Sequence, residues 1–289
     1  MREWDDRVTQ LTIATKKVVA QRYGRAPART WMTGISNGGY LTRWQLENRP
    51  WLYDGGVDWE GTLFTPNGPN LFTYLPTALR DFPQAQTDPA ARQQMYAVGF
   101  APGSEVLWPD HYAEYWDLTQ RTYREAFDPT YDGATKAGTP FCKVGGPPGT
   151  STACDAQYNY ASRPQSVKDA VASVSLTGRI GKPLITLHGD LDALLPIRTD
   201  SDVYNKMIIA AGRGGLHRYY TIQDGNHVDD RADLYPNQIR PILPCYREAF
   251  LRLTAWVTAG ARPPATQFVR RPTSGDVANT CPQLAATTG

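Results

Sequence analysis

The chain has 289 residues, which is enough for one large α/β domain with an insertion. Its formal net charge of +2 is too close to neutral to indicate binding to nucleic acid or to an acidic membrane surface. No apolar run approaches the ~20 residues of a membrane span, and the abundant Tyr and Trp (16 and 8) favour an aromatic-lined cleft or a heavily packed cap.

The first 60 residues predict helix, strand, helix and strand. A helix is expected over residues 6–23, a short strand ending at Thr33, a second helix over 39–48 and a strand over 55–59. Strand, helix and strand at this spacing form a βαβ unit, so the sheet should be parallel. The expected core-facing residues of the first helix are Val8, Leu11, Ile13, Val18 and Val19.

The run from Gly34 to Gly38 fits the G-x-S-x-G pattern at the turn between the first strand and the second helix. So tight a turn strains the backbone of Ser36, and flanking glycines remove the Cβ atoms that would collide there. The backbone N–H of Asn37 would point at a developing oxyanion, supported by the positive end of the following helix. The pattern predicts Ser36 as a nucleophile and Asn37 as an oxyanion donor.

The succession of predicted strands stops after Gly61 and resumes near residue 183. The stretch 62–182 is rich in aromatic residues and is expected to be a mainly helical lid inserted into the core 1–61 and 183–289; a separate structural domain is the alternative. Trp59 and Trp108 are the candidate substrate contacts. Helices are expected over 71–82, 89–98, 111–127 and 164–174.

The last third predicts strands over 183–187 and 218–221, helices over 199–212 and 239–259, and an irregular tail from 262. Asp192 follows the first of these strands, and His227 follows the second. The carboxyl ends of parallel strands share one sheet edge, where open α/β sheets build their sites. Histidine titrates in the range of a general base, and a carboxylate fixes its tautomer. We therefore predict a Ser36–His227–Asp192 triad.

Several other residues compete for these roles. Asp190 competes with Asp192, and three further carboxylates lie near His227 in sequence; they are Asp224, Asp229 and Asp230. His188 is expected to hold a turn, and His111 and His217 have no motif around them. Asp58 and Glu60 end a strand near the site, where they could bind a cation or polar group, or cap turns and pair with arginines.

The four cysteines predict two disulfides, Cys142–Cys154 and Cys245–Cys281. No C-x-x-C pair is present and the histidines lie elsewhere, so no metal site is expected. Two disulfides indicate an oxidising compartment, and hence a secreted protein whose leader is absent from this chain. Four free thiols are the alternative.

Three segments together resemble the α/β-hydrolase superfamily. They are the turn 34–38, which resembles its nucleophile elbow, the loop His188–Pro196, which resembles the loop of its catalytic acid, and the Gly-Asn-His turn ending at His227. A long insertion between these parts is similar to tannases and feruloyl esterases, and secreted polyester and hydroxyalkanoate-oligomer hydrolases are similar at this level. Ile35 and Asn226 stand where many tannase-type enzymes carry bridged cysteines. The resemblance implies a truncated α/β-hydrolase fold with a mostly parallel sheet.

Only 33 residues precede Gly34, fewer than the superfamily places before its elbow. The expected sheet edge must be covered or paired, which suggests a homodimer. The second oxyanion donor has no candidate here. The expected function is a secreted serine hydrolase that cleaves carboxylic esters of aromatic or polymeric substrates without a cofactor. A prolyl-oligopeptidase-like peptidase and a non-catalytic binding protein on the same scaffold are the alternatives.

Overall fold

The computed structural model describes residues 1–131 and 155–285, which form two compact units. The first unit comprises Met1–Thr62, Leu176–Asp190 and the chain from Asp200 onward, and the second comprises Leu63–Ser175 and Leu191–Thr199. Ser36 and His227 therefore belong to the first unit. Asp192 belongs to the second.

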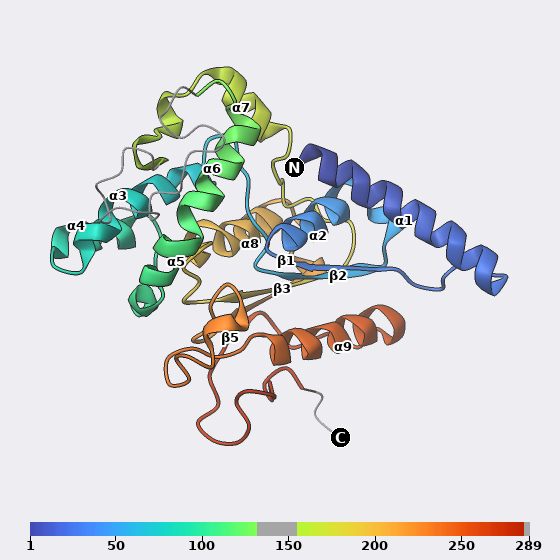
Figure 1. Cartoon of the computed structure of the whole chain (residues 1–289). Coiled ribbons are helices and arrows are strands. Elements are labelled where there is room, and N and C mark those ends of the chain that lie inside the picture. The colour runs from blue at the N-terminus through green and yellow to red at the C-terminus, as the bar shows by residue number, and fades with distance from the viewer. Residues whose placement is uncertain (132–154, 286–289) are drawn as a thin grey trace. The chain divides into compact units, whose positions relative to one another are not determined.

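A five-stranded parallel sheet forms the centre of the first unit, in the order β1-β2-β3-β4-β5 (Figure 1). The strands are β1 (Trp31–Ile35), β2 (Gly55–Trp59), β3 (Leu184–Gly189), β4 (His217–Ile222) and β5 (Gln267–Val269). The predicted α/β class with a parallel sheet is confirmed. The tail from residue 262 was expected to be irregular, and β5 corrects this: its three residues pair with β4.

Helices cover both faces of this sheet. They are α1 (Arg2–Tyr23), α2 (Asn37–Asn48), α8 (Ser201–Ala210) and α9 (Leu243–Ala259). α2 packs on β1 and β2 from one side, and α9 packs on β2 and β3 from the other (Figure 1). α9 begins four residues later than predicted, with Pro244 in its first turn, where the missing N–H costs nothing.

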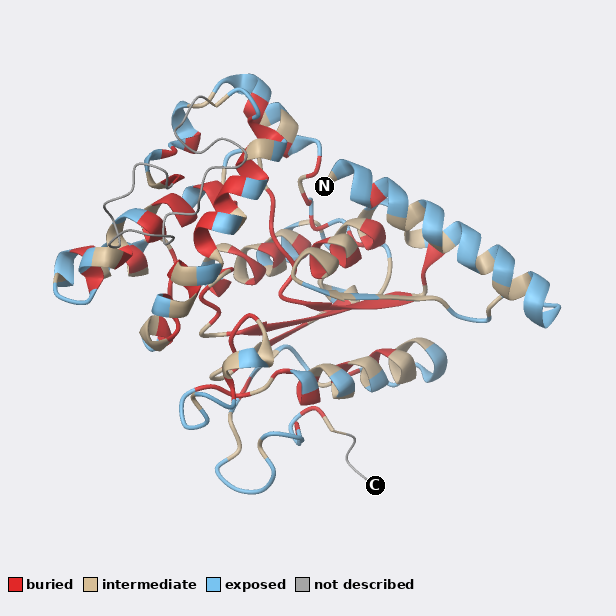
Figure 2. Ribbon diagram, viewed as in Figure 1, coloured by how far each residue is buried: buried red, intermediate tan, exposed pale blue. Residues whose placement is uncertain are grey.

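The two faces of the sheet differ in chemistry because side chains alternate along each strand. On β2, Val57 and Trp59 join an apolar cluster with α9, whereas Asp58 between them pairs with Arg43 of α2. β3 repeats the pattern, with Leu187 in the apolar cluster. Figure 2 shows that the strands at the centre are buried. One face is an ordinary hydrophobic core, and the other carries buried charge.

The predicted core face of α1 is wrong for three of its five residues. Leu11 is 66% exposed and Val18 61%, while Ile13 is 41% exposed. The reason is that α1 packs mainly on α2. Its contacts are polar instead: the Thr12 hydroxyl lies 2.7 Å from the Tyr53 hydroxyl.

The second unit is helical and has an aromatic core. Its helices are α3 (Leu75–Ala85), α4 (Pro89–Ala97), α5 (Trp108–Glu114), α6 (Trp116–Phe127) and α7 (Gln165–Ala172). The single helix predicted over 111–127 is two helices, divided at Tyr115. Trp116 is fully buried and its ring contacts Phe82 and Phe100. None of the helices in the described residues has both the length and the hydropathy needed to cross a bilayer.

A disulfide joins Cys245 in α9 to Cys281 in the tail, as predicted. It closes a loop of 36 residues, and such a constraint typically stabilises a fold by roughly 2–4 kcal/mol. Cys142 and Cys154 lie outside the described residues.

Asp5 gives the first unit a pH-dependent stability. Its side chain is 1% exposed between α1 and α2, and burial raises the pKa of its carboxyl to about 7, although Tyr40 donates a hydrogen bond to it. Between about pH 4 and pH 7 the folded chain keeps a proton that the unfolded chain releases. The free energy of unfolding should therefore fall as the pH rises through this window.

Asp5→Asn should remove the loss of folding stability that accompanies the rise from about pH 4 to pH 7. We expect the substitution to raise the free energy of unfolding at pH 8 by on the order of 2–4 kcal/mol, and by much less at pH 4. Urea unfolding of both proteins at the two pH values measures the difference. An equal effect of the substitution at both pH values would contradict the assignment.

Candidate active site

Ser36 lies between β1 and α2 with φ 57° and ψ −118°, outside the usual regions for a non-glycine residue. Its N–H donates to the Trp59 carbonyl at 2.9 Å, and its carbonyl accepts from Tyr40 at 2.9 Å and Thr62 at 3.3 Å. These bonds attach the strained residue to its own helix and to the turn after β2. This is the strand–turn–helix geometry of a nucleophile elbow.

Close backbone approaches explain the glycines around this turn. A Cβ on Gly34 would lie 2.3 Å from the carbonyl carbon of Gly38, and one on Gly39 would lie 2.6 Å from Cα of Gly61. The prediction that the turn needs glycine at both flanks is right for Gly34. It is wrong for Gly38, because a Cβ there would meet no atom within 4 Å. The second close approach is at Gly39.

Asn37 is the first residue of α2. N–H groups in the first turn of a helix have no acceptor within the helix and carry its partial positive charge. The Asn37 side chain accepts a 3.4 Å hydrogen bond from the Thr62 hydroxyl. The backbone around Asn37 is thus suited to hold an oxyanion next to Ser36.

His227 follows β4 on the predicted turn and is 5% exposed. Two features fix this turn. The Asp190 carboxylate accepts the Asp224 N–H at 2.7 Å, and a Cβ on Gly225 would lie 2.9 Å from Cα of Gly189. Ser36 and His227 therefore both follow the carboxyl ends of parallel strands in one unit.

Glu60 is a residue of the site whose partner the sequence did not reveal. It directly follows β2, it is fully buried, and its Oε2 lies 3.4 Å from Nδ1 of His227. Its Oε1 accepts the Gly189 N–H at 2.6 Å. The signal available in the sequence was only its position at the end of a strand. Which histidine it would meet depended on the pairing of β2, β3 and β4.

Asp192 lies in the second unit and is 1% exposed. Its Oδ1 accepts N–H groups from Leu194 at 2.7 Å and Leu195 at 2.8 Å, which closes the turn around it. These bonds fix the orientation of the carboxylate. The assignment of Asp192 as the acid of the triad stays a prediction.

The competing carboxylates have other contacts in the structure. Asp190 holds the Asp224 amide, and burial raises the pKa of its carboxyl to about 6. Asp229 caps α9 by accepting the N–H groups of Ile242 and Leu243. The remaining two form ion pairs, Asp224 with Arg271 at 3.4 Å and Asp230 with Arg231 at 3.8 Å.

A buried polar network lies behind the turn that carries Glu60. Asp58 accepts from Arg43 Nε at 2.5 Å, from the Thr186 hydroxyl at 3.0 Å and from the Gly61 N–H at 2.8 Å. Arg43 also donates to Asp200 at 2.8 Å. Burial opposes the charge on Arg43, but Asp58 and Asp200 outweigh it and raise the pKa of the guanidinium. Asp58 thus pairs with an arginine, one of the two roles expected for it.

Three other histidines have structural surroundings. His188 Nδ1 lies 2.6 Å from the Ser201 hydroxyl. His217 contacts the Thr186 hydroxyl through Nε2, and burial lowers its pKa to about 3, so it is neutral. His111 is buried in α5, with Nδ1 2.9 Å from the Leu107 carbonyl.

Trp59 and Trp108, the candidate substrate contacts, are both buried. Trp59 is 8% exposed and its ring packs on Tyr246 of α9, 5.4 Å between centroids. Trp108 is 2% exposed, and its indole N–H donates to the Ser104 hydroxyl at 2.9 Å. Packing within each unit accounts for both side chains.

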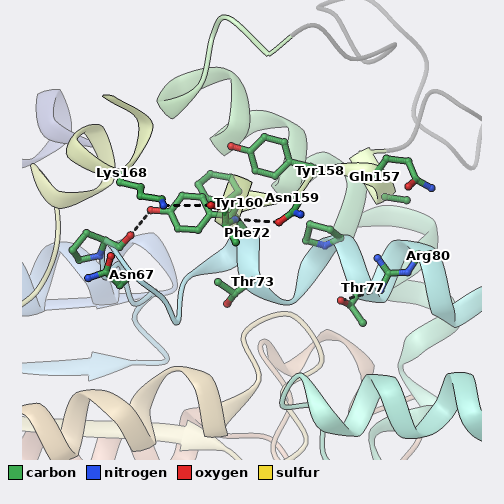
Figure 3. A pocket seen from close by; sticks show the side chains of 14 residues that line it. Asn67, Phe72, Thr73, Thr77, Arg80, Gln157, Tyr158, Asn159, Tyr160 and Lys168 are labelled. Carbon is green, nitrogen blue, oxygen red and sulfur yellow. Dashed lines mark hydrogen bonds between the residues drawn. The ribbon is translucent and has the colours of Figure 1, made fainter. Parts of the chain in front are cut away.

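A cavity of about 550 Å³ lies within the second unit (Figure 3). Phe72 and Tyr160 stack in its wall, and Arg80 and Lys168 contribute cationic side chains. The Tyr160 hydroxyl is held by the Pro66 carbonyl at 2.7 Å. None of Ser36, Asp192 and His227 lines this cavity, so it is separate from the predicted triad.

The glycine contacts predict a sharp difference between neighbouring substitutions. Gly34→Ala should destabilise the fold by about 3 kcal/mol, because the new Cβ collides with backbone that cannot move aside. Gly38→Ala is the matched control. It should be neutral or stabilising by roughly 0.5–1 kcal/mol, because alanine favours a helix more than glycine does. Thermal and urea unfolding measure both, and equal destabilisation would contradict the geometry.

No protein-family model matches this chain, and no curated protein sequence does. Solved structures that are similar include feruloyl esterase B from Aspergillus oryzae, with 14% identity, a TM-score of 0.46 and 87% of this chain covered. Another is an esterase from Aspergillus oryzae, with 12% identity, a TM-score of 0.45 and 89% of this chain covered. The acylaminoacyl peptidase of Pyrococcus horikoshii has 13% identity, a TM-score of 0.41 and 83% of this chain covered. The chain spans 63%, 64% and 26% of the lengths of these three proteins, respectively.

Proposed function

We propose that this chain is a serine hydrolase of the α/β-hydrolase type that cleaves carboxylic ester bonds. The observation that carries the proposal is the backbone of Ser36. It is held at positive φ between a parallel strand and a helix, with Gly34 against Gly38 behind it. A strained non-glycine residue at the carboxyl edge of a sheet is typical of functional positions.

The proposed mechanism forms an acyl-enzyme. His227 takes the proton of Ser36, whose oxygen attacks the ester carbonyl, and the Asn37 amide stabilises the oxyanion. His227 then protonates the leaving alcohol. A water molecule, activated by the same imidazole, releases the acid. Asp192 is the predicted carboxylate partner of His227.

The proposed substrates are esters with aromatic or polymeric parts. The aromatic content of residues 62–182 supports this, and we propose that this stretch acts as a lid. Esterases are among the similar solved structures, which is consistent with ester hydrolysis.

We also propose that the protein is exported and that it self-associates. The Cys245–Cys281 disulfide supports export, because such bonds persist in oxidising compartments. A reduced pair in protein isolated from its native source would contradict it.

The proposed homodimer would form through the outer edge of β1. Among the described residues, β1 pairs with β2 and with no other strand. Light scattering coupled to size-exclusion chromatography should give about twice the mass of the chain. A monomer at every concentration tested would rule the dimer out.

Removing the hydroxyl of Ser36 tests the proposed function. Ser36→Ala should lower hydrolysis of p-nitrophenyl esters by roughly 10⁴-fold or more, while thermal unfolding stays close to that of the wild type. Asp192→Asn should lower kcat with an intact fold if Asp192 is the acid. Retained esterase activity in Ser36→Ala would refute the nucleophile, and turnover of matched amides as fast as esters would favour a peptidase.

A further inference from the structure

The carboxylate of Glu60 contacts the predicted catalytic base within a single compact unit. Its Oε2 lies 3.4 Å from Nδ1 of His227, and both side chains are buried, Glu60 at 0% and His227 at 5% exposure. The contact joins the ends of β2 and β4, which are separated in the sheet by β3. It is a long-range contact built by the fold.

The second oxygen of Glu60 fixes the direction of the carboxylate. Oε1 accepts the N–H of Gly189 at 2.6 Å, at the end of β3. The Glu60 N–H in turn donates to the Leu187 carbonyl at 2.9 Å. With the backbone and one oxygen attached to β3, the other oxygen lies at ion-pair distance from His227, without the alignment of a hydrogen bond in this structure.

The backbone of Glu60 is strained in a way that suggests function. Ser36, Glu60 and Asp224 are the non-glycine residues with positive φ in the part of the chain that the structure describes, at 57°, 51° and 60°. They follow the carboxyl ends of β1, β2 and β4. Such conformations are strained for a residue with a side chain, and they cluster at active sites. The strained residues at this edge of the sheet therefore lie in the turns that carry Ser36, Glu60 and His227.

The turn of Glu60 is also joined to the nucleophile. Ser36 N–H donates to Trp59, Ser36 carbonyl accepts from Thr62, and Gly61 packs on Gly39 too closely for a Cβ on either. The Asp58 carboxylate holds the Gly61 N–H at 2.8 Å. Ser36 and Glu60 therefore share one rigid support.

We propose that Glu60 is a positioning residue for His227. Its carboxylate accepts a hydrogen bond from Nδ1–H, which leaves Nε2 as the free base for the Ser36 hydroxyl. It also stabilises the imidazolium that forms when Nε2 takes the proton of Ser36. This is the role predicted for Asp192, so the two carboxylates are alternative partners for the one N–H at Nδ1. This inference rests on the proposed function, and it assigns the contact on Nδ1 to Glu60, the residue after β2.

Glu60→Gln tests the proposal with little change of shape. The amide oxygen can keep the Gly189 hydrogen bond, which presents an NH₂ group to His227 and disfavours a proton on Nδ1. We expect kcat for an ester to fall by roughly 10²–10⁴-fold with little change in KM. Glu60→Asp should restore part of the activity.

A second measurement does not depend on turnover. Nitrogen-15 NMR of the imidazole, assigned with a His227→Gln variant, reports which ring nitrogen carries the proton. The wild type should show the Nδ1–H form, and Glu60→Gln should shift the population toward Nε2–H. An unchanged tautomer with wild-type kinetics would overturn the proposal, and so would a wild-type imidazole protonated on Nε2.

Glu47→Gln is the matched control. Glu47 in α2 also accepts backbone N–H groups, from Thr177 and Gly178 at 2.8 Å, and it holds the Tyr204 hydroxyl. Its substitution should lower stability without changing the tautomer of His227 or kcat. If the wild type hydrolyses no ester at all, the proposed function fails, and the NMR result still decides the role of Glu60.

Discussion

The buried carboxylate of Asp58 is the constraint on which the site depends. It is fully enclosed, and it accepts from the α2 guanidinium of Arg43, the β3 hydroxyl of Thr186 and the amide of Gly61. An unpaired charge at this depth would be strongly unfavourable, and breaking such a pair typically costs roughly 3–5 kcal/mol. Satisfying Asp58 therefore requires the elbow helix, the third strand and the turn after β2 to come together in one arrangement. The same arrangement holds the turn of Ser36 against the turn that carries Glu60.

The alternation of side chains along the strands separates stability from chemistry. Val57, Leu187 and Ile222 build an apolar core with α9, and the Cys245–Cys281 disulfide closes that side of the sheet. Asp58 and Thr186, on the opposite face, belong to the polar network. A site that needs buried charge thus has a rigid hydrophobic layer beneath it. Buried polar networks of this kind hold their members in defined positions when every group is satisfied.

Local patterns predicted most of the elements of the sheet and the strained turn. The strands β1 to β4, the helix after Gly34 and the disulfide at Cys245 all depend on short-range sequence signals, namely apolar runs, glycines and cysteine positions. The apolar residues of α1 were wrongly expected to be buried, because periodicity shows a face but not the neighbour that covers it. α1 meets polar side chains of α2, Tyr40 and Gln45. The strand β5 was missed because three residues carry too little pattern.

Within the site, the sequence identified residues but not their partners. Ser36 and His227 could be proposed because each follows a strand within a motif. The contact of Glu60 with His227 could not, since it depends on the order in which β2, β3 and β4 pair. In the same way, the sequence indicated glycine at both flanks of Ser36, but only the three-dimensional contacts show that Gly39, and not Gly38, approaches the neighbouring turn.

Covalent trapping of the nucleophile is the most direct test of the central claim. The wild-type protein would be incubated with a fluorophosphonate, digested and mapped by mass spectrometry. The account predicts a single adduct on Ser36 that disappears when the protein is unfolded before labelling, because the hydroxyl is reactive only beside a positioned base. An unlabelled protein, or an adduct on another serine, would contradict it.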